Sequence, residues 1–146
     1  AQTMYDRYRG FESACRAHDI PIWPEFCLTD SKRGHFYFQD EVREFVDSLQ
    51  NLPEGFVCAN DVTAYTVISC LRERGLSVPE DLAVSGYDNI KASILTASEL
   101  TTVAVETADL GKRLAQQLLR QLESPISFHE VVYIQPQVIF KRSTEF

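Results

Sequence analysis

The sequence has no apolar run approaching the roughly 18 residues needed to cross a membrane, and it shows no recognisable signal peptide. Basic residues are also few: 14 Lys and Arg stand against 21 Asp and Glu, and the net charge is −7. Surfaces that bind nucleic acids are usually basic. These absences argue against a membrane protein and against a DNA-binding surface on this chain.

Motifs of common catalytic and cofactor sites are missing as well. There is no G-x-S-x-G, no G-x-G-x-x-G and no phosphate-binding loop. The three histidines, His18, His35 and His129, are scattered and lack the spacing of metal ligands. We therefore expect no enzyme activity, no cofactor and no metal.

The four cysteines, Cys15, Cys27, Cys58 and Cys70, include no C-x-x-C pair. Three of them fall within apolar periodic runs, so we interpret them as reduced thiols in the core of an intracellular protein. Two disulfide bonds are the alternative that the sequence leaves open.

The remaining composition is typical of a globular domain, with 45% hydrophobic and 24% charged residues. A length of 146 residues suggests one domain, or one domain with a piece of another. The chain begins without an initiator Met, and we expect it to be part of a longer protein.

Hydrophobic periodicity predicts four helices, at 4–18, 36–50, 61–74 and 107–122. Short apolar runs predict strands at 25–29, 55–59, 82–86 and 101–105, and one or two closing strands within 130–142, broken at Pro136. Alternating strands and helices indicate an α/β fold, a doubly wound parallel sheet with helices on both faces.

Polar side chains follow the predicted strands at their carboxyl ends, where ligands bind in sheets of this kind. Asp88 follows the strand at 82–86, and Asn60 follows the preceding strand. Arg7 lies in the first turn of the first helix, which opens on the same edge. We therefore predict one polar cluster for a small ligand; its members are Arg7, Asp30, Asn60 and Asp88, with Ser31 beside Asp30.

The chemistry of these side chains suits a polyol. A carboxylate such as Asp88 accepts hydrogen bonds from two neighbouring hydroxyls, and the planar fork of Arg7 suits sugar oxygens, carboxylates or phosphates. Structural roles compete with this interpretation. Asp88 fits an ordinary turn, Asn60 fits the N-cap of the next helix, and Asp30 and Ser31 fit a loop turn.

Five blocks of the sequence resemble the lactose/galactose repressor family of bacterial transcription regulators. They match the family in order and spacing and read RYRGF (7–11), FVCANDVTA (56–64), RGLSVPEDLAVSGYDN (74–89), LTTV (100–103) and KRST (141–144). The resemblance implies a two-lobed domain, like that of periplasmic binding proteins, that binds a sugar, nucleobase or other metabolite between its lobes. It also implies dimerisation, and a separate headpiece that binds operator DNA.

The resemblance assigns residues 1–100 to the C-terminal lobe of the effector-binding domain. It assigns 101–125 to a crossover strand and helix that normally belong to the N-terminal lobe, and 126–146 to the return segment to the C-terminal lobe. The headpiece and most of the N-terminal lobe are expected outside this chain, so operator DNA would be contacted only through that headpiece.

Site roles are implied as well. The family's arginine, asparagine and aspartate that contact sugar hydroxyls match Arg7, Asn60 and Asp88. Many members carry an aromatic residue that packs on the ligand just after the second strand, where this chain has Ser31 and Lys32. A ring of the ligand would therefore be stacked by another part of the protein or not at all.

In the family, the helix that matches 61–74 and the loop that matches Leu95 and Thr96 lie at the dimer interface. This places Tyr65 there, although a core position is the default for an aromatic residue on that helix.

A second dimer contact is predicted from the leucine stripe of helix 107–122, formed by Leu110, Leu114, Leu118 and Leu122. Leucines left in water would forgo roughly 1.5–3 kcal/mol each, so the stripe should be covered. We predict a homodimer whose interface includes Leu114 and Leu118.

The sequence thus predicts the effector-sensing, dimerising part of a cytoplasmic transcription regulator without catalytic activity, its effector a small molecule, most simply a sugar. The alternative is a transport-linked periplasmic sugar-binding protein of the same fold.

Overall fold

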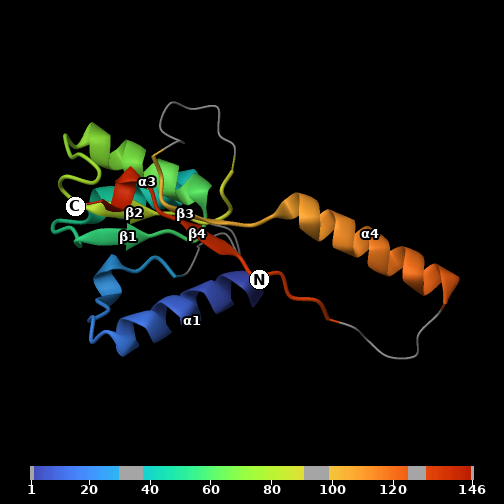
Figure 1. Ribbon diagram of the computed structural model, residues 1–146. Coiled ribbons are helices and arrows are strands. Elements are labelled where there is room, and N and C mark those ends of the chain that lie inside the picture. The colour runs from blue at the N-terminus through green and yellow to red at the C-terminus, as the bar shows by residue number, and fades with distance from the viewer. Residues whose placement is uncertain (1, 30–37, 91–98, 125–130, 146) are drawn as a thin grey trace.

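The computed structural model describes residues 2–29, 38–90, 99–124 and 131–145 (Figure 1). The helices are α1 (Gln2–Ala17), α2 (Gln39–Ser48), α3 (Asp61–Glu73) and α4 (Thr107–Glu123). The strands are β1 (Gly55–Val57), β2 (Ala83–Ser85), β3 (Thr102–Ala104) and β4 (Gln137–Ile139), and two short 3-10 helices are η1 (Pro24–Phe26) and η2 (Arg142–Thr144). All four predicted helices are present.

The strands form two pairs, β1 with β2 and β3 with β4. β1 runs parallel to β2, with Val57 opposite Ser85. Two parallel bridges, Ser85 to Thr101 and Asp88 to Ala104, join β2 to the β3 segment. The predicted parallel arrangement is confirmed for these three, whereas β4 runs antiparallel to β3.

The core lies where α2 and α3 pack together and α3 meets β2. Its most deeply buried side chains, all 0% exposed, are Val46, Ala64, Cys70, Leu71 and Val84. Helix α3 covers one side of the strands and α1 lies on the other (Figure 1). The apolar stripe predicted for the first helix ends at Cys15, which is buried. Burial of a large apolar side chain contributes about 1.5–3 kcal/mol, so these contacts hold α3 on the sheet.

Arg74 ties the C-terminal ends of α2 and α3 together. It is the C-cap residue of α3, and its guanidinium donates to the backbone oxygens of Val46, at 2.7 Å, and Leu49, at 3.1 Å. The last carbonyls of a helix lack the usual partners within the helix, and Arg74 donates to two of them at the C-terminal end of α2. Val46 O also accepts from the Leu49 N–H at 3.3 Å. Next to it, Arg43 of α2 forms an ion pair with Glu73 of α3.

The predicted strand at 25–29 is wrong, because none of these residues lies in a strand. Residues 24–26 form η1 instead, and the Cys27 N–H donates to Pro24 O at 3.1 Å. The fixed φ of Pro24 suits the first position of a helical turn. No described strand lies beside this segment, so its backbone bonds to itself rather than to a ladder.

The cysteines are free thiols, so the structure does not adopt the disulfide alternative. Cys15, Cys58 and Cys70 are buried, as the reduced-core interpretation predicts, and Cys27 is half-buried.

Helix α4 projects away from the strands (Figure 1). It has no buried residue. Its leucine stripe is open: Leu114 is 59% exposed, Leu118 61% and Leu122 71%. The described part of the chain therefore does not fold back over this face.

Candidate functional site

Arg7 and Asp88 meet, although 81 positions separate them in the chain. Nη2 of Arg7 lies 3.2 Å from Oδ1 of Asp88. Nη1 of the same guanidinium donates to the backbone oxygen of Ala59 at 2.5 Å. Its central carbon lies 3.6 Å from the ring centroid of Tyr87, within the range of a cation–π contact. The predicted proximity of Arg7 and Asp88 is confirmed, and three partners orient the guanidinium.

Asn60 follows Ala59 and therefore lies at the same edge of the sheet. Its side-chain oxygen accepts from the Thr63 N–H at 2.8 Å, which makes it the N-cap of α3. This confirms the capping role that the sequence left open. Within the part of the chain that the structure describes, the Asn60 side-chain NH₂ makes no hydrogen bond, so it can donate to a ligand.

Asp88 sits in a turn, Tyr87–Ile90, with an unusual backbone. Its φ is 107° and that of Asn89 is 49°, both in a region that side-chain-bearing residues seldom adopt. The Asp88 N–H donates to Val103 O at 3.0 Å, and this bond anchors the turn to the β3 segment. Among the described residues only Oδ1 of Asp88 has a partner, which leaves Oδ2 available to accept.

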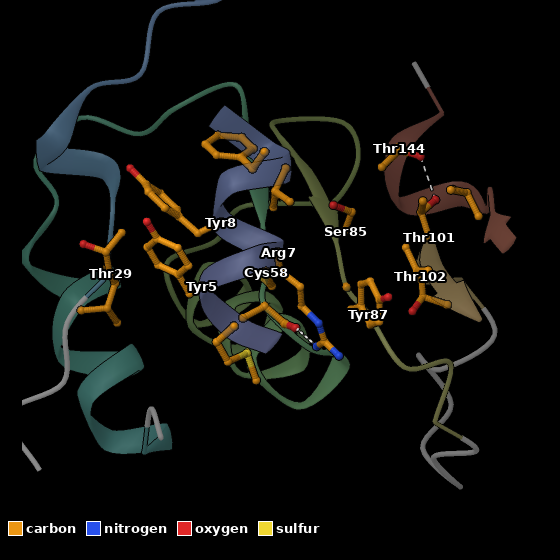
Figure 2. Close-up of a pocket in the computed structure, with 18 of the residues that line it drawn as sticks. Tyr5, Arg7, Tyr8, Thr29, Cys58, Ser85, Tyr87, Thr101, Thr102 and Thr144 are labelled. Atoms are coloured by element: carbon orange, nitrogen blue, oxygen red, sulfur yellow. Dashed lines mark hydrogen bonds between the residues drawn. The ribbon is translucent and has the colours of Figure 1, made fainter. Parts of the chain in front are cut away.

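A cavity of about 800 Å³ opens beside this cluster. Small-molecule sites typically measure about 300–1,000 Å³. Helix α1 forms one wall and the ends of β1, β2 and β3 form the other; the lining includes Tyr5, Arg7, Tyr8, Phe11, Cys58, Ala59, Ser85, Tyr87 and Thr102. Figure 2 shows the Arg7 side chain directed toward Tyr87. Asn60 and Asp88 are not lining residues, but each directly follows one, so they stand at the rim.

Aromatic side chains of the cavity come from α1, from the Asp88 turn and from Phe140, which follows β4. Tyr8 and Phe11 lie with ring centroids 6.4 Å apart, and Tyr5 lies one turn earlier. The sequence interpretation did not assign these residues to the site. A signal was available for Tyr87, which precedes Asp88 in the block GYDN, part of the resemblance to the repressor family. The signal for the α1 tyrosines was their helical spacing next to Arg7.

The Cys58 thiol lines the cavity without being reactive. Burial, and then the charge of Asp61, raise its pKa from 9.0 to about 12. A thiol is nucleophilic only as the thiolate. Cys58 is therefore a packing residue at neutral pH.

The other predicted site residues fall in different places. Tyr65 is partly buried and packs against the core, which is the default role. Leu114 and Leu118 are exposed on α4. Asp30, Ser31, Leu95 and Thr96 lie outside the described residues.

Across the described ranges, no helix combines the length and apolar character that a membrane span requires. The same residues contain no group of three or more His, Cys, Asp or Glu side chains arranged to hold a metal ion.

The family of periplasmic binding protein-like domains matches residues 1–144 of this chain. Among curated relatives, the HTH-type transcriptional repressor PurR of Histophilus somni (strain 129Pt) is 33% identical over 145 residues, covering 98% of this chain and 42% of the repressor. The arabinose metabolism transcriptional repressor of Geobacillus stearothermophilus is 31% identical, covering 96% of this chain and 39% of the repressor. The chain thus spans about two fifths of these relatives.

The similar solved structures are also transcriptional regulators. A LacI family transcriptional regulator from Enterococcus faecium with bound ribose has a TM-score of 0.80 at 27% identity, over 97% of this chain and 51% of that one. The transcriptional regulator LacI from Bacillus cereus subsp. cytotoxis has a TM-score of 0.81 at 26% identity, over 97% and 49%. These relatives are transcriptional regulators, which does not favour the transport-linked alternative.

Proposed function

This chain belongs to the family of periplasmic binding protein-like domains, in the form found in regulators of the lactose/galactose repressor type, and from that premise we propose that it senses a small-molecule effector for a transcription regulator. The observation that carries the proposal is the cluster of Arg7, Asp88 and Asn60 at the mouth of the cavity. In this proposal the chain does not perform catalysis. The regulator of which it is part acts in the cytoplasm.

The polar groups at the rim favour an uncharged polyol. The charge of Arg7 is balanced by Asp88, so the pair offers little net attraction to an ion. Oδ2 of Asp88 and the amide of Asn60 supply an acceptor and a donor for neighbouring hydroxyls. Tyr5 and Tyr8 provide aromatic surface for the apolar face of a sugar ring. The ribose bound to the regulator from Enterococcus faecium supports this class of ligand.

Signalling in this proposal depends on two lobes. Residues 1–100 contribute the C-terminal lobe, 101–125 cross to the N-terminal lobe, and 126–146 return. An effector held between the lobes stabilises one closed arrangement, and the shift in population reaches a DNA-binding headpiece beyond this chain. Operator DNA is bound only by that headpiece.

The proposal includes a homodimer. One contact is the face of α3 with Tyr65, continued by Leu95 and Thr96. The other is the leucine stripe of α4, where Leu114 and Leu118 are open to a partner.

A thermal-shift screen of the full-length gene product tests the proposed function. Sugars, nucleosides and amino acids are compared, because a ligand that binds only the folded state raises the melting temperature. We expect the largest shifts from monosaccharides or disaccharides. A screen in which only charged compounds shift the melting temperature would contradict the sugar class, and a screen without any shift would contradict effector binding.

A further inference from the structure

A buried hydrogen-bond relay lies beneath the Asp88 turn. Asp61, the first residue of α3, is 1% exposed, and Thr102 of β3 is 2% exposed. The Thr102 hydroxyl donates to Oδ1 of Asp61 at 2.6 Å and accepts from the Asn89 N–H at 3.2 Å. Oδ2 of Asp61 accepts from the Ile90 N–H at 2.9 Å. The relay therefore joins β3, α3 and two consecutive amides of the turn.

Asp61 holds the turn from both sides of Asp88. Its carboxylate binds Ile90, and its backbone N–H donates to the carbonyl oxygen of Tyr87 at 2.8 Å. A buried carboxylate is costly unless hydrogen bonds satisfy it. Here donors reach both carboxylate oxygens, and the N-terminal end of α3 adds a favourable dipole.

Gly86 makes room for this arrangement. A Cβ placed at Gly86 would lie 2.3 Å from Oδ1 of Asp61 and 3.1 Å from its Cα. Any side chain at this position would push the carboxylate away from Thr102. The glycine before Tyr87 is therefore explained by the close approach of Asp61, not by a positive φ.

The turn needs such support because its backbone is strained. Left-handed φ angles at non-glycine residues are unfavourable and persist only where surrounding contacts enforce them. Asp88 and Asn89 both carry such angles. The Arg7 contact to Asp88 is partly exposed, so it supplies little of the restraint.

We propose that Asp61 and Thr102 are positioning residues, which hold the Tyr87–Ile90 turn so that the Asp88 carboxylate stays directed to Arg7 and to the effector. The ligand in this inference is the effector of the proposed function, on which the inference rests. The hydrogen bonds of the relay can be tested without any ligand. Asp61 does not line the cavity; Thr102 does, but its hydroxyl is already bonded to Asp61 and to the Asn89 N–H. In this proposal both residues act through the backbone of the turn.

Hydrogen exchange at single amides in the full-length gene product tests the relay. Thr102→Val removes the hydroxyl and keeps the shape. The Ile90 amide is informative because it binds Oδ2 of Asp61, which Thr102 does not touch. We expect Ile90 to exchange about tenfold faster relative to core amides of α3 when Asp61 loses its restraint, and Thr102→Ser to restore protection.

Ser143→Ala is the matched control. Ser143 is 4% exposed, and its hydroxyl also makes two buried hydrogen bonds, to Val84 O at 2.6 Å and from the Thr101 N–H at 2.8 Å. It should lower global stability without a specific effect on Ile90. The positioning role is wrong if, in Thr102→Val, exchange of the Ile90 amide accelerates no more than exchange of the core amides. It is also wrong if exchange at Ile90 accelerates equally in Thr102→Val and Ser143→Ala.

Calorimetric titration with D-ribose adds the functional measurement. If the wild type binds D-ribose, we expect about tenfold weaker binding in Thr102→Val, recovery in Thr102→Ser and no change in Ser143→Ala. Unchanged affinity in Thr102→Val would overturn the link between relay and site. Absence of binding by the wild type counts against ribose as the ligand of the proposed function, and the exchange result still decides the relay.

Discussion

At the scale of single residues, the Arg7–Asp88 pair contributes little to stability. The two side chains are 26% and 38% exposed, and partly exposed ion pairs are typically worth about 0–1 kcal/mol. The unusual φ of Asp88 costs more than that. The Arg7–Asp88 pair therefore does not repay the strain of the turn in stability. The strained turn is better explained by a binding role, in which it directs the Asp88 carboxylate toward a ligand.

Asp88→Ala should therefore weaken effector binding by about 30-fold, which corresponds to about 2 kcal/mol for a charge-assisted hydrogen bond, while costing about 1 kcal/mol of unfolding free energy or less. Calorimetric titration and urea unfolding measure the two effects. Asp81→Ala is a suitable control, because Asp81 is another turn aspartate, accepting from the Ser77 N–H at 2.7 Å away from the cavity. Unchanged affinity in Asp88→Ala would return this residue to a purely structural role.

Cys58 gives a prediction about pH. Its thiol has a pKa of about 12 in the folded chain and an ordinary value of 9.0, so both states are protonated below pH 9 and its contribution is fully present there. As the pH rises from 9 toward 12, the unfolded chain ionises first and stability falls, by at most about 1.4 kcal/mol per pH unit.

Cys58→Ala lacks this dependence. The difference in unfolding free energy between wild type and Cys58→Ala should shrink between pH 9 and 11 in urea titrations, since all other thiols are common to both proteins. A constant difference over this range would show that Cys58 ionises in the folded chain as it does in the unfolded one.

At the scale of elements, the α2–α3 pair depends on a side chain that bridges two helix ends. Arg74→Met should lower the free energy of unfolding by about 1–3 kcal/mol, because the carbonyls of Val46 and Leu49 at the C-terminal end of α2 lose charged donors. Arg72→Met, two residues earlier and exposed, should stay within about 0.5 kcal/mol of wild type. Urea unfolding compares the two variants, and equal effects would exclude a bridging role for Arg74.

At the scale of the whole molecule, the open stripe of α4 predicts self-association. Light scattering of the chain at high concentration should give the mass of a dimer, and Leu114→Lys with Leu118→Lys should give a monomer, because charges would be buried at the interface. Gln116→Lys with Glu123→Gln adds the same charge on the opposite face and should leave the dimer intact. A monomeric wild-type chain would contradict the prediction.

Net charge gives a second prediction at this scale. With a charge of −7, the chain alone should not retard DNA in a gel-shift assay at any salt concentration. The full-length gene product should retard its operator, and its affinity should fall as salt rises. Salt-sensitive binding by the chain alone would place a DNA-binding surface within these residues.

Apart from the segment 25–29, the order of helices and strands followed from the sequence alone, because hydrophobic periodicity and capping residues act over a few positions. The helix from Asp61 to Glu73 is an example: Asn60 begins it and the buried side chains repeat along it. The edge of the sheet that carries the site was also predictable, since parallel strands end on the same side.

Tertiary structure decided what depends on distant partners. Residues 24–26 became a 3-10 helix because a strand requires a neighbour, and local sequence does not specify one. The direction of β4, the stacking of Arg7 on Tyr87, the reach of Arg74 to α2 and the burial of Asp61 beneath the Asp88 turn are likewise contacts between segments far apart in the chain. Periodicity reports which face of an element is apolar, whereas only the packed fold determines which side chain lies opposite it.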